Sequence, residues 1–391
     1  MVKFSEPDHT ARQHSQRLRE FIFDEIESKS GRITFARYME LALYAPGLGY
    51  YSAGAQKFGK TGDFVTAPEI SVLFSQCLAR QCQQVLEVLN GGSILEIGAG
   101  SGKMALDLLL ALERQNCLPH DYKILEVSAD LRHRQQILFK TQAPHLYKYI
   151  TWLDSLCIEA FKGLILANEV LDALPAHRFQ WDAASILREW YVSRDGNALV
   201  WELGEPGGEE LIRAVQNLCI PAQAVCYNTE INLILPSWIN SLGACLNKGL
   251  IIVIDYGFPR AEYYHVDRNM GTLMCHYQHQ AHGDPFRLPG LQDISVHVDF
   301  TAVAESGVNA DLCVGGYTTQ AAFLLSCGLL DLASSLSVLE DTRRRFVLNQ
   351  EIHQLTSPAE MGELFKVMAL SRGLEDVNLL GFILQDQRGR L

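Results

Sequence analysis

The sequence predicts an α/β protein built on a mostly parallel, doubly wound sheet of the Rossmann-like type. Three observations support this prediction: short apolar runs of strand length, helix-length segments between most of them, and a glycine-rich turn directly after the first run. The chain has 391 residues, of which 48% are hydrophobic and 20% charged, so it can bury a large core. Apolar runs that alternate with helices are typical of a parallel sheet covered on both faces.

The predicted strands are Ser93–Ile97, Tyr122–Glu126, Tyr149–Trp152, Gly163–Ala167 and Leu250–Ile254, with a late strand at Phe365–Ala369. Ahead of them, apolar residues at helical spacing predict a helix over residues 12–27. A second helix is expected from Thr34, a favourable N-cap residue, to about Leu43. These two helices and the loop after them form a predicted helical N-terminal cap, residues 1–60.

The remaining predicted domains follow from the strand positions. Residues 61–177 are the first part of the Rossmann-like core, and residues 248–391 are its second part, with a substrate-side loop over 256–300. Between them lies an insertion, residues 178–247, with hairpin-like and helical pieces. Insertions after the carboxyl ends of strands are where such folds carry substrate lids.

Composition and charge exclude several partners and compartments. The net charge of −12 argues against nucleic acid, which binds to clustered Lys and Arg. The ten cysteines are scattered and form no C-x-x-C pair. The first 30 residues lack a signal or transit pattern, and no apolar run is long enough to span a bilayer. We therefore expect a bacterial-type cytoplasmic protein without membrane insertion; the sequence leaves a homodimer open.

The segment from Glu96 to Gly102 carries the clearest chemical signal. An apolar strand ends in Gly98, Gly100 and Gly102, and a helix-forming segment follows. Glycines in a strand-to-helix turn let the backbone approach a ligand closely. The third glycine lies one residue earlier than the dinucleotide pattern G-x-G-x-x-G requires. This spacing favours S-adenosylmethionine (SAM) over NAD as the cofactor.

Three carboxylates are placed to hold that cofactor. Glu96 is predicted to bind the cofactor's ammonium group through charge-assisted hydrogen bonds. Glu126, at the end of the second strand, suits the ribose hydroxyls, and Asp154, after the third strand, suits the adenine amino group. The alternative is that Glu126 and Asp154 are ordinary loop acids.

Polar residues also follow the fourth strand, within a stretch that is otherwise apolar. Asn168, Glu169 and Asp172 are predicted to hold an acceptor nitrogen in line with the sulfonium, and Asn168 is expected to contact the cofactor as well. The alternative for Asn168 or Asp172 individually is a helix cap.

With these motifs, the chain resembles the MidA-like family of SAM-dependent methyltransferases. The matching segments are Leu43–Tyr51, Gly62–Glu69, the glycine turn, Asn168–Pro175, Asp255–Gly257 and Asp293–Phe300. The resemblance implies a class I methyltransferase fold and a loop at Gly62 and Asp63 that closes over the cofactor. For the family's mitochondrial members it implies symmetric dimethylation of an arginine on a respiratory complex I subunit. Ala99 stands where the family usually has proline.

An arginine acceptor sets a physical requirement. The guanidinium pKa is above about 12, so carboxylates must orient the group and offset its charge. Glu169 and Asp172, helped by Glu189 or Asp299, are the candidates for this task.

Three other interpretations compete with this one. Residues 54–61 match the P-loop pattern G-x-x-x-x-G-K-[ST], and Ile251–Asp255 resembles its acidic partner strand, but the strand and helix that a phosphate loop needs are missing. Residues 275–282 are rich in His but fit no tetrahedral metal site, so we expect no metal and a substrate contact at His279. The third is a non-catalytic scaffold that binds a respiratory subunit during assembly.

Overall fold

The computed structural model describes residues 6–53, 65–156, 159–182, 184, 186–218, 226–337 and 342–391. The chain forms two compact units, each assembled from separate segments. The first unit comprises Met1–Phe64, Asp172–Leu235 and Arg260–His297, and the second comprises Val65–Leu171, Pro236–Pro259 and Val298–Leu391. Within the described part of the chain, no helix has the length and apolarity needed to cross a bilayer.

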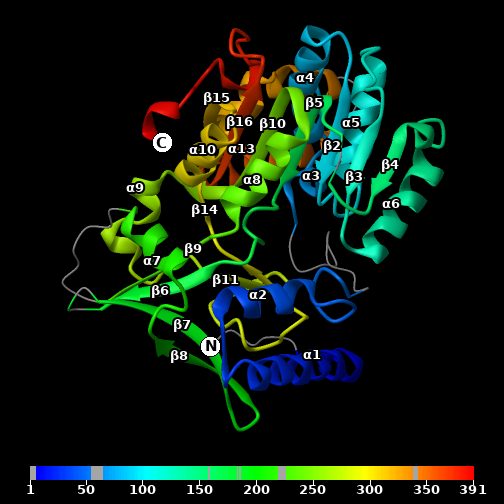
Figure 1. Cartoon of the computed structure of the whole chain (residues 1–391). Coiled ribbons are helices and arrows are strands. Elements are labelled where there is room, and N and C mark those ends of the chain that lie inside the picture. Colours follow the sequence, from blue (N-terminus) through cyan, green and yellow to red (C-terminus); the bar gives the residue numbers. More distant parts are fainter. Residues whose placement is uncertain are drawn as a thin grey trace. The chain divides into compact units, whose positions relative to one another are not determined.

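The second unit contains an eight-stranded sheet (Figure 1). Its strands, in spatial order, are β15 (Cys313–Thr319), β16 (Phe365–Arg372), β10 (Leu246–Phe258), β5 (Phe161–Asn168), β2 (Ser93–Ile97), β3 (Tyr122–Leu125) and β4 (Ile150–Leu153), with β14 (Val298–Asp299) beside the end of β10. The strands from β10 to β4 are parallel, whereas β16 runs antiparallel between β10 and β15. The sheet is therefore mostly parallel, which confirms the predicted fold class.

The chain reverses direction across this sheet next to β2. It runs from β2 outward through β3 and β4, and then returns to the other side of β2 to form β5. Such a reversal is a topological switch point, where the loops after two neighbouring strands separate and leave room for a ligand. The glycine turn follows β2, and Asn168 ends β5. Both predicted motifs therefore lie at the switch point.

Helices complete the second unit. They are α3 (Ala67–Ile70), α4 (Val72–Val88), α5 (Lys103–Arg114), α6 (Ala129–Gln142), α8 (Leu235–Ala244), α10 (Phe300–Asn309), α11 (Gln320–Ser326), α12 (Leu329–Ser337), α13 (Thr342–Thr356) and α14 (Met361–Leu364), with short 3₁₀ turns η1 (Tyr147–Tyr149), η3 (Leu380–Phe382) and η4 (Arg388–Arg390). Apolar side chains of α4, α5 and α6 form one continuous core with those of the sheet. Burial of this apolar surface stabilises the unit and fixes the strand ends that carry the site.

The first unit contains two smaller sheets. One has the order β1 (Arg32–Thr34), β7 (Leu187–Asp195), β6 (His177–Trp181) and β9 (Tyr227–Ile231), with β8 (Ala198–Gly204) also paired to β7; the other has the order β12 (Gln280–His282), β11 (Met274–Tyr277) and β13 (Asp293–Ser295). Its helices are α1 (His9–Ser28), α2 (Phe35–Tyr44), α7 (Glu209–Gln216) and α9 (Arg260–Tyr263), with the 3₁₀ turn η2 (Val266–Arg268). One core cluster joins α1 and α2 to both sheets.

The structure confirms the predicted strands and N-terminal helices. The first run coincides with β2, and the next three lie within two residues of β3, β4 and β5. Thr34 accepts a hydrogen bond from the Arg37 N–H as the N-cap of α2. Strand β10 is longer than its apolar run at both ends, and β15 was not predicted. Most of the segments predicted as the cap, the lid and the 256–300 loop belong to the first unit, but residues 236–247 of the predicted lid belong to the second.

Candidate functional site

The turn after β2 is built from glycines in the left-handed region. Gly98, Gly100 and Gly102 have φ angles of +65°, +54° and +84°, and Gly102 is the N-cap of α5. A Cβ on Gly102 would lie 3.0 Å from the Gln135 Cγ, and one on Gly98 would lie 3.3 Å from a Val170 methyl carbon. The turn therefore presents bare backbone at a helix N-terminus, where N–H groups lack intrahelical partners. This geometry suits the polar end of a nucleoside cofactor.

Gln135 of α6 connects the parts of this region. Its Nε2 donates to the Gly100 carbonyl at 2.8 Å and to Glu126 Oε2 at 3.2 Å, and its Oε1 accepts from Trp152 Nε1 at 2.9 Å. The side chain is fully buried. Gln135 thus fixes the glycine turn against the ends of β3 and β4. Gln135 was not among the predicted site residues, although a polar residue between Leu131 and Phe139 on the buried stripe of α6 was a usable signal.

Glu126 follows β3 directly and is nearly buried. Its Oε1 accepts a hydrogen bond from the Ser128 N–H at 3.0 Å, and Gln135 holds the other oxygen. The carboxylate is therefore held at the carboxyl edge of the sheet, one strand from the glycine turn. Its predicted contact with the ribose remains a prediction.

Glu96 has a different environment. The side chain is buried in β2, and Oε2 accepts a hydrogen bond from the Tyr122 hydroxyl at 2.6 Å. Burial raises its pKa, the hydrogen bond from Tyr122 lowers it and the negative charge of Glu126 raises it, so that the pKa is about 7. The carboxyl group of Glu96, which is predicted to bind the cofactor's ammonium group, thus changes charge near neutral pH.

Asp154, predicted near the adenine, has a side chain that is 91% exposed, and its Oδ1 lies 2.7 Å from Arg132 Nη1. Ser101, inside the glycine turn, donates from its hydroxyl to Glu69 of α3. Gly62 and Asp63, the predicted closing loop, lie outside the described residues, as does the P-loop-like segment 54–61.

The turn after β5 is conformationally unusual. Glu169 has a φ of +52°, which a residue with a long side chain rarely adopts. The Asn168 side-chain amide donates to Glu169 Oε1 at 3.2 Å, and the Glu169 N–H donates to the Ile254 carbonyl at 2.9 Å. Strained residues of this kind cluster at functional sites. The two predicted acceptor-side residues of the second unit are therefore adjacent and held in one turn.

Asp255 of β10 shapes that turn. Its Oδ2 accepts from the N–H groups of Val170 at 3.2 Å and Leu171 at 2.9 Å, and its Oδ1 accepts from the Tyr256 N–H. The side chain is fully buried. In the sequence, Asp255 stands out only as part of the family match and as a resemblance to the acidic strand of a P-loop protein. Its observed contacts are those of a residue that fixes the Glu169 turn.

Asp172, the third predicted acceptor-side residue, belongs to the first unit. Its side chain is nearly buried, and its carbonyl accepts from the Val296 N–H at 3.0 Å. Asp293 of β13 is also buried and accepts from the Tyr51 hydroxyl at 2.9 Å. Burial, followed by the charges of Asp293 and Asp172, raises the Tyr51 pKa well above its usual value. Both carboxylates thus raise the pKa of one tyrosine. The ring of Tyr51 stacks on that of Tyr44, with 5.6 Å between the ring centroids.

The two suggested helper acids have structural partners. Asp299 is the N-cap of α10 and accepts from the Thr301 and Ala302 N–H groups. Glu189 is buried in β7; burial raises its pKa, but hydrogen bonds from His177 and the Gly207 N–H outweigh this, so the pKa is lowered overall. Among the described residues, no group of three His, Cys, Asp or Glu side chains is arranged to hold a metal.

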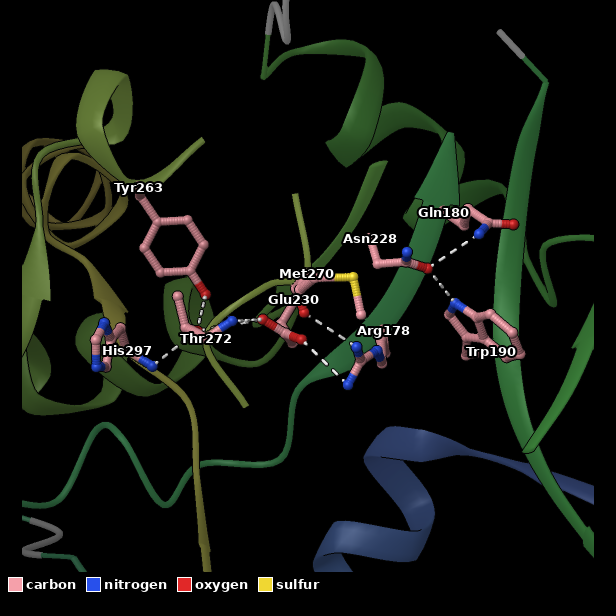
Figure 2. Close-up of polar contacts among 9 residues, drawn as sticks. All are labelled: Arg178, Gln180, Trp190, Asn228, Glu230, Tyr263, Met270, Thr272 and His297. Carbon is pink, nitrogen blue, oxygen red and sulfur yellow. Dashed lines mark hydrogen bonds and ion pairs between the residues drawn. The ribbon is translucent and has the colours of Figure 1, made fainter. Parts of the chain in front are cut away.

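Arg178 of β6 and Glu230 of β9 are paired in one sheet of the first unit, and their hydrogen bonds connect that sheet to the loop before β11 (Figure 2). Arg178 Nη1 lies 3.7 Å from Glu230 Oε1, and Arg178 Nη2 donates to the Met270 carbonyl at 3.1 Å. Glu230 Oε2 accepts from the Thr272 N–H at 2.7 Å, and Thr272 Oγ1 in turn accepts from the His297 N–H at 3.1 Å. Glu230 is fully buried, which raises its pKa despite the charge of Arg178. This network was not predicted from the sequence.

The switch point, the bare glycine turn and the acid after β3 define an α/β enzyme of the nucleoside-cofactor-binding class. Comparisons with known proteins narrow this class. The family model "Putative S-adenosyl-L-methionine-dependent methyltransferase" matches residues 77–318. The chain belongs to this family, which confirms the resemblance found in the sequence. Its cofactor is SAM, and the glycine turn and Glu126 fit that group because they offer bare backbone amides and a carboxylate at a switch point.

Two solved structures match the whole chain. A Burkholderia thailandensis protein with S-adenosyl-homocysteine bound is 42% identical, with a TM-score of 0.94 and 100% coverage of both chains. A native crystal structure from the same organism gives 42% identity, a TM-score of 0.92 and the same coverage. Among curated proteins, the mitochondrial protein arginine methyltransferase NDUFAF7 homolog of Caenorhabditis elegans is 27% identical over 98% of this chain and 92% of its own length. The Drosophila melanogaster homolog is 27% identical over 88% and 83%.

Proposed function

We propose that this methyltransferase modifies the guanidinium group of a protein arginine. The observation that carries the proposal is the pair of buried carboxylates, Asp172 and Asp293, that act on Tyr51 in the first unit. Buried carboxylates beside stacked aromatic rings suit a planar cation, because guanidinium binds carboxylates through paired hydrogen bonds and stacks on rings. The relatives named as protein arginine methyltransferases support the same acceptor.

Methyl transfer depends more on how the acceptor nitrogen is positioned against the methyl group than on a strong acid or base. SAM supplies an electrophilic methyl carbon; a guanidinium nitrogen forms the new N–C bond while the S–C electron pair stays with sulfur. The nitrogen then releases a proton to solvent. Asn168, Glu169 and Asp172 are proposed to orient the acceptor nitrogen and to offset its charge. Gly98, Gly100, Gly102, Glu96, Glu126 and Asp154 are proposed to hold the cofactor.

The protein that carries the arginine is proposed to be a subunit of respiratory complex I. This part of the proposal rests on the family resemblance in the sequence. It implies that the chain acts on that subunit during assembly of the complex.

The test is transfer of labelled methyl groups. The purified chain is incubated with tritiated SAM and an array of peptides that carry Arg, Lys, Gln, His or Glu at the centre, and labelled products are hydrolysed and separated as amino acids. We expect label in methylarginines only. Label in another amino acid would overturn the arginine assignment, and SAM binding without transfer to peptides or to complex I subunits would favour the scaffold interpretation.

A further inference from the structure

The hairpin between β11 and β12 has a turn that its residue types disfavour. Tyr277 pairs with Gln280, so Gln278 and His279 are the two turn residues. Their φ angles are +48° and +60°. Two-residue turns with both φ angles positive are normally made from Asn-Gly, Asp-Gly or Gly-Gly, because a Cβ atom crowds the following carbonyl oxygen. His adopts a positive φ more often than most residues, whereas Gln does not, so this turn is strained most at Gln278.

The strain is unusual within the described part of the chain. The other non-glycine residues there with positive φ are Ser30, Asn90, Asn116, Glu169 and Asp311. All but Glu169 have short polar side chains, and Asn and Asp in particular tolerate this region. Glu169 lies in the proposed methyl-transfer turn. The long side chains with positive φ are thus found at that turn and at the hairpin tip.

The base of the hairpin is held firmly. Thr272 precedes β11 and His297 follows β13, and the two are joined through Thr272 Oγ1 (Figure 2). Buried Glu230 fixes Thr272 at both its N–H and its hydroxyl. Local strain persists only where the surrounding structure determines the conformation. The network of Figure 2 supplies that constraint for a strained tip.

The hairpin also shares its sheet with the proposed acceptor-binding acids. His276 of β11 pairs directly with Asp293 of β13, the residue that accepts from the Tyr51 hydroxyl. One residue beyond β13, the Val296 N–H donates to the Asp172 carbonyl. The strained tip is thus part of the small sheet that carries the acceptor side of the first unit.

We propose that Gln278 and His279 bind the polypeptide main chain that flanks the methyl-accepting side chain. Both side chains are exposed. A carboxamide and an imidazole each donate and accept hydrogen bonds, which matches the alternating N–H and C=O groups of an extended peptide. The hairpin tip then selects protein acceptors over free amino acids. This inference rests on the protein acceptor of the proposed function and is independent of which amino acid is methylated.

The test replaces the strained pair by the residues the turn favours, Gln278→Asn with His279→Gly. The matched control is Asp311→Gly, an exposed position with a φ of +57° in the second unit. We expect the hairpin variant to gain about 1–2 °C in Tm because strain is relieved, and the control to change less, since Asp tolerates a positive φ. Retention of the peptide array by protein saturated with S-adenosyl-homocysteine should fall about tenfold for the hairpin variant and stay unchanged for the control.

Each outcome of this test either supports or overturns the inference. An unchanged or lower Tm in the hairpin variant would show that the turn is not strained, and equal peptide retention would show that its side chains do not bind the acceptor. A wild-type protein that retains no peptide, whatever its central residue, overturns the inference as well. Label in an amino acid other than arginine, together with weaker retention in the hairpin variant, would overturn the proposed acceptor and support the inference.

Discussion

In the second unit, the polar residues of the site stand at the ends of strands around an apolar sheet, whereas the first unit buries an ion pair beneath a loop. Strand ends expose polar groups at little cost, since water or a ligand can satisfy them. A buried charge requires a partner of opposite charge next to it, because an unpaired charge in the interior is costly. The glycine turn of the proposed cofactor side is therefore contiguous in the sequence, whereas the polar network of the first unit depends on contacts between distant segments.

We expect the largest effect on stability from removing the ion pair between Arg178 and Glu230, which tests the contrast between the two units. We expect Arg178→Met to lower the free energy of unfolding by about 3–5 kcal/mol, because Glu230 would remain buried without its cation. Adding Glu230→Gln should recover much of the loss. Urea unfolding followed by tryptophan fluorescence measures both; a loss below about 1 kcal/mol in the single variant would show that the pair contributes little.

The glycine turn tests the cofactor side. Gly100→Val should weaken SAM binding at least about 100-fold, or about 2.7 kcal/mol, because a branched side chain fills the bare turn and strains its backbone. The matched control is Gly196→Val, at a φ of +57° in the β7–β8 turn. It should cost stability but leave SAM affinity unchanged in calorimetry. Equal affinities for the two variants would refute the site assignment.

The acids of the first unit should affect transfer and spare cofactor binding. Asp172→Asn is expected to reduce kcat about 10- to 100-fold on an arginine peptide, with SAM affinity unchanged, since the amide cannot offset a cation. Asp293→Asn should act in the same direction. Full activity in both variants would remove these carboxylates from the proposed mechanism.

The smallest expected effect concerns pH. Because burial raises the folded-state pKa of Glu96 to about 7, from an ordinary value of 4.5, the folded protein binds an extra proton between these values. The contribution of Glu96 to stability is therefore largest at the acidic end of this range and falls by about 1–3 kcal/mol as pH rises through it. Glu96→Gln should remove that fall in urea unfolding measured from pH 5 to 8.

Cofactor binding at the same residue has the opposite pH dependence. If Glu96 holds an ammonium group, its ionised form binds, so SAM affinity should rise from pH 5.5 to 7 in the wild type relative to Glu96→Gln. Parallel affinity profiles for the two proteins would show that the carboxyl group of Glu96 does not contact the cofactor.

The sequence predicted the parallel sheet because each buried strand is a local apolar run, and it predicted the glycine turn because the turn is contiguous. It did not reveal Gln135, Asp255 or the Arg178–Glu230 pair. Each is an ordinary polar residue locally, and its role depends on partners that only tertiary structure brings near. Strands such as β15 and β9 were missed because they contain several polar residues and lack a continuous apolar run.

Asp255 also has a consequence for the order of assembly during synthesis. The turn after β5 takes its shape from a carboxylate that lies 85 residues later than Val170. A nascent chain that ends before β10 can form β2, the glycine turn and β3, but it lacks Asp255 and the Ile254 carbonyl, which hold the turn at Glu169. We expect this proposed methyl-transfer turn to take its final shape only after β10 has been made, so that a half-made chain can bind nucleoside without carrying out chemistry.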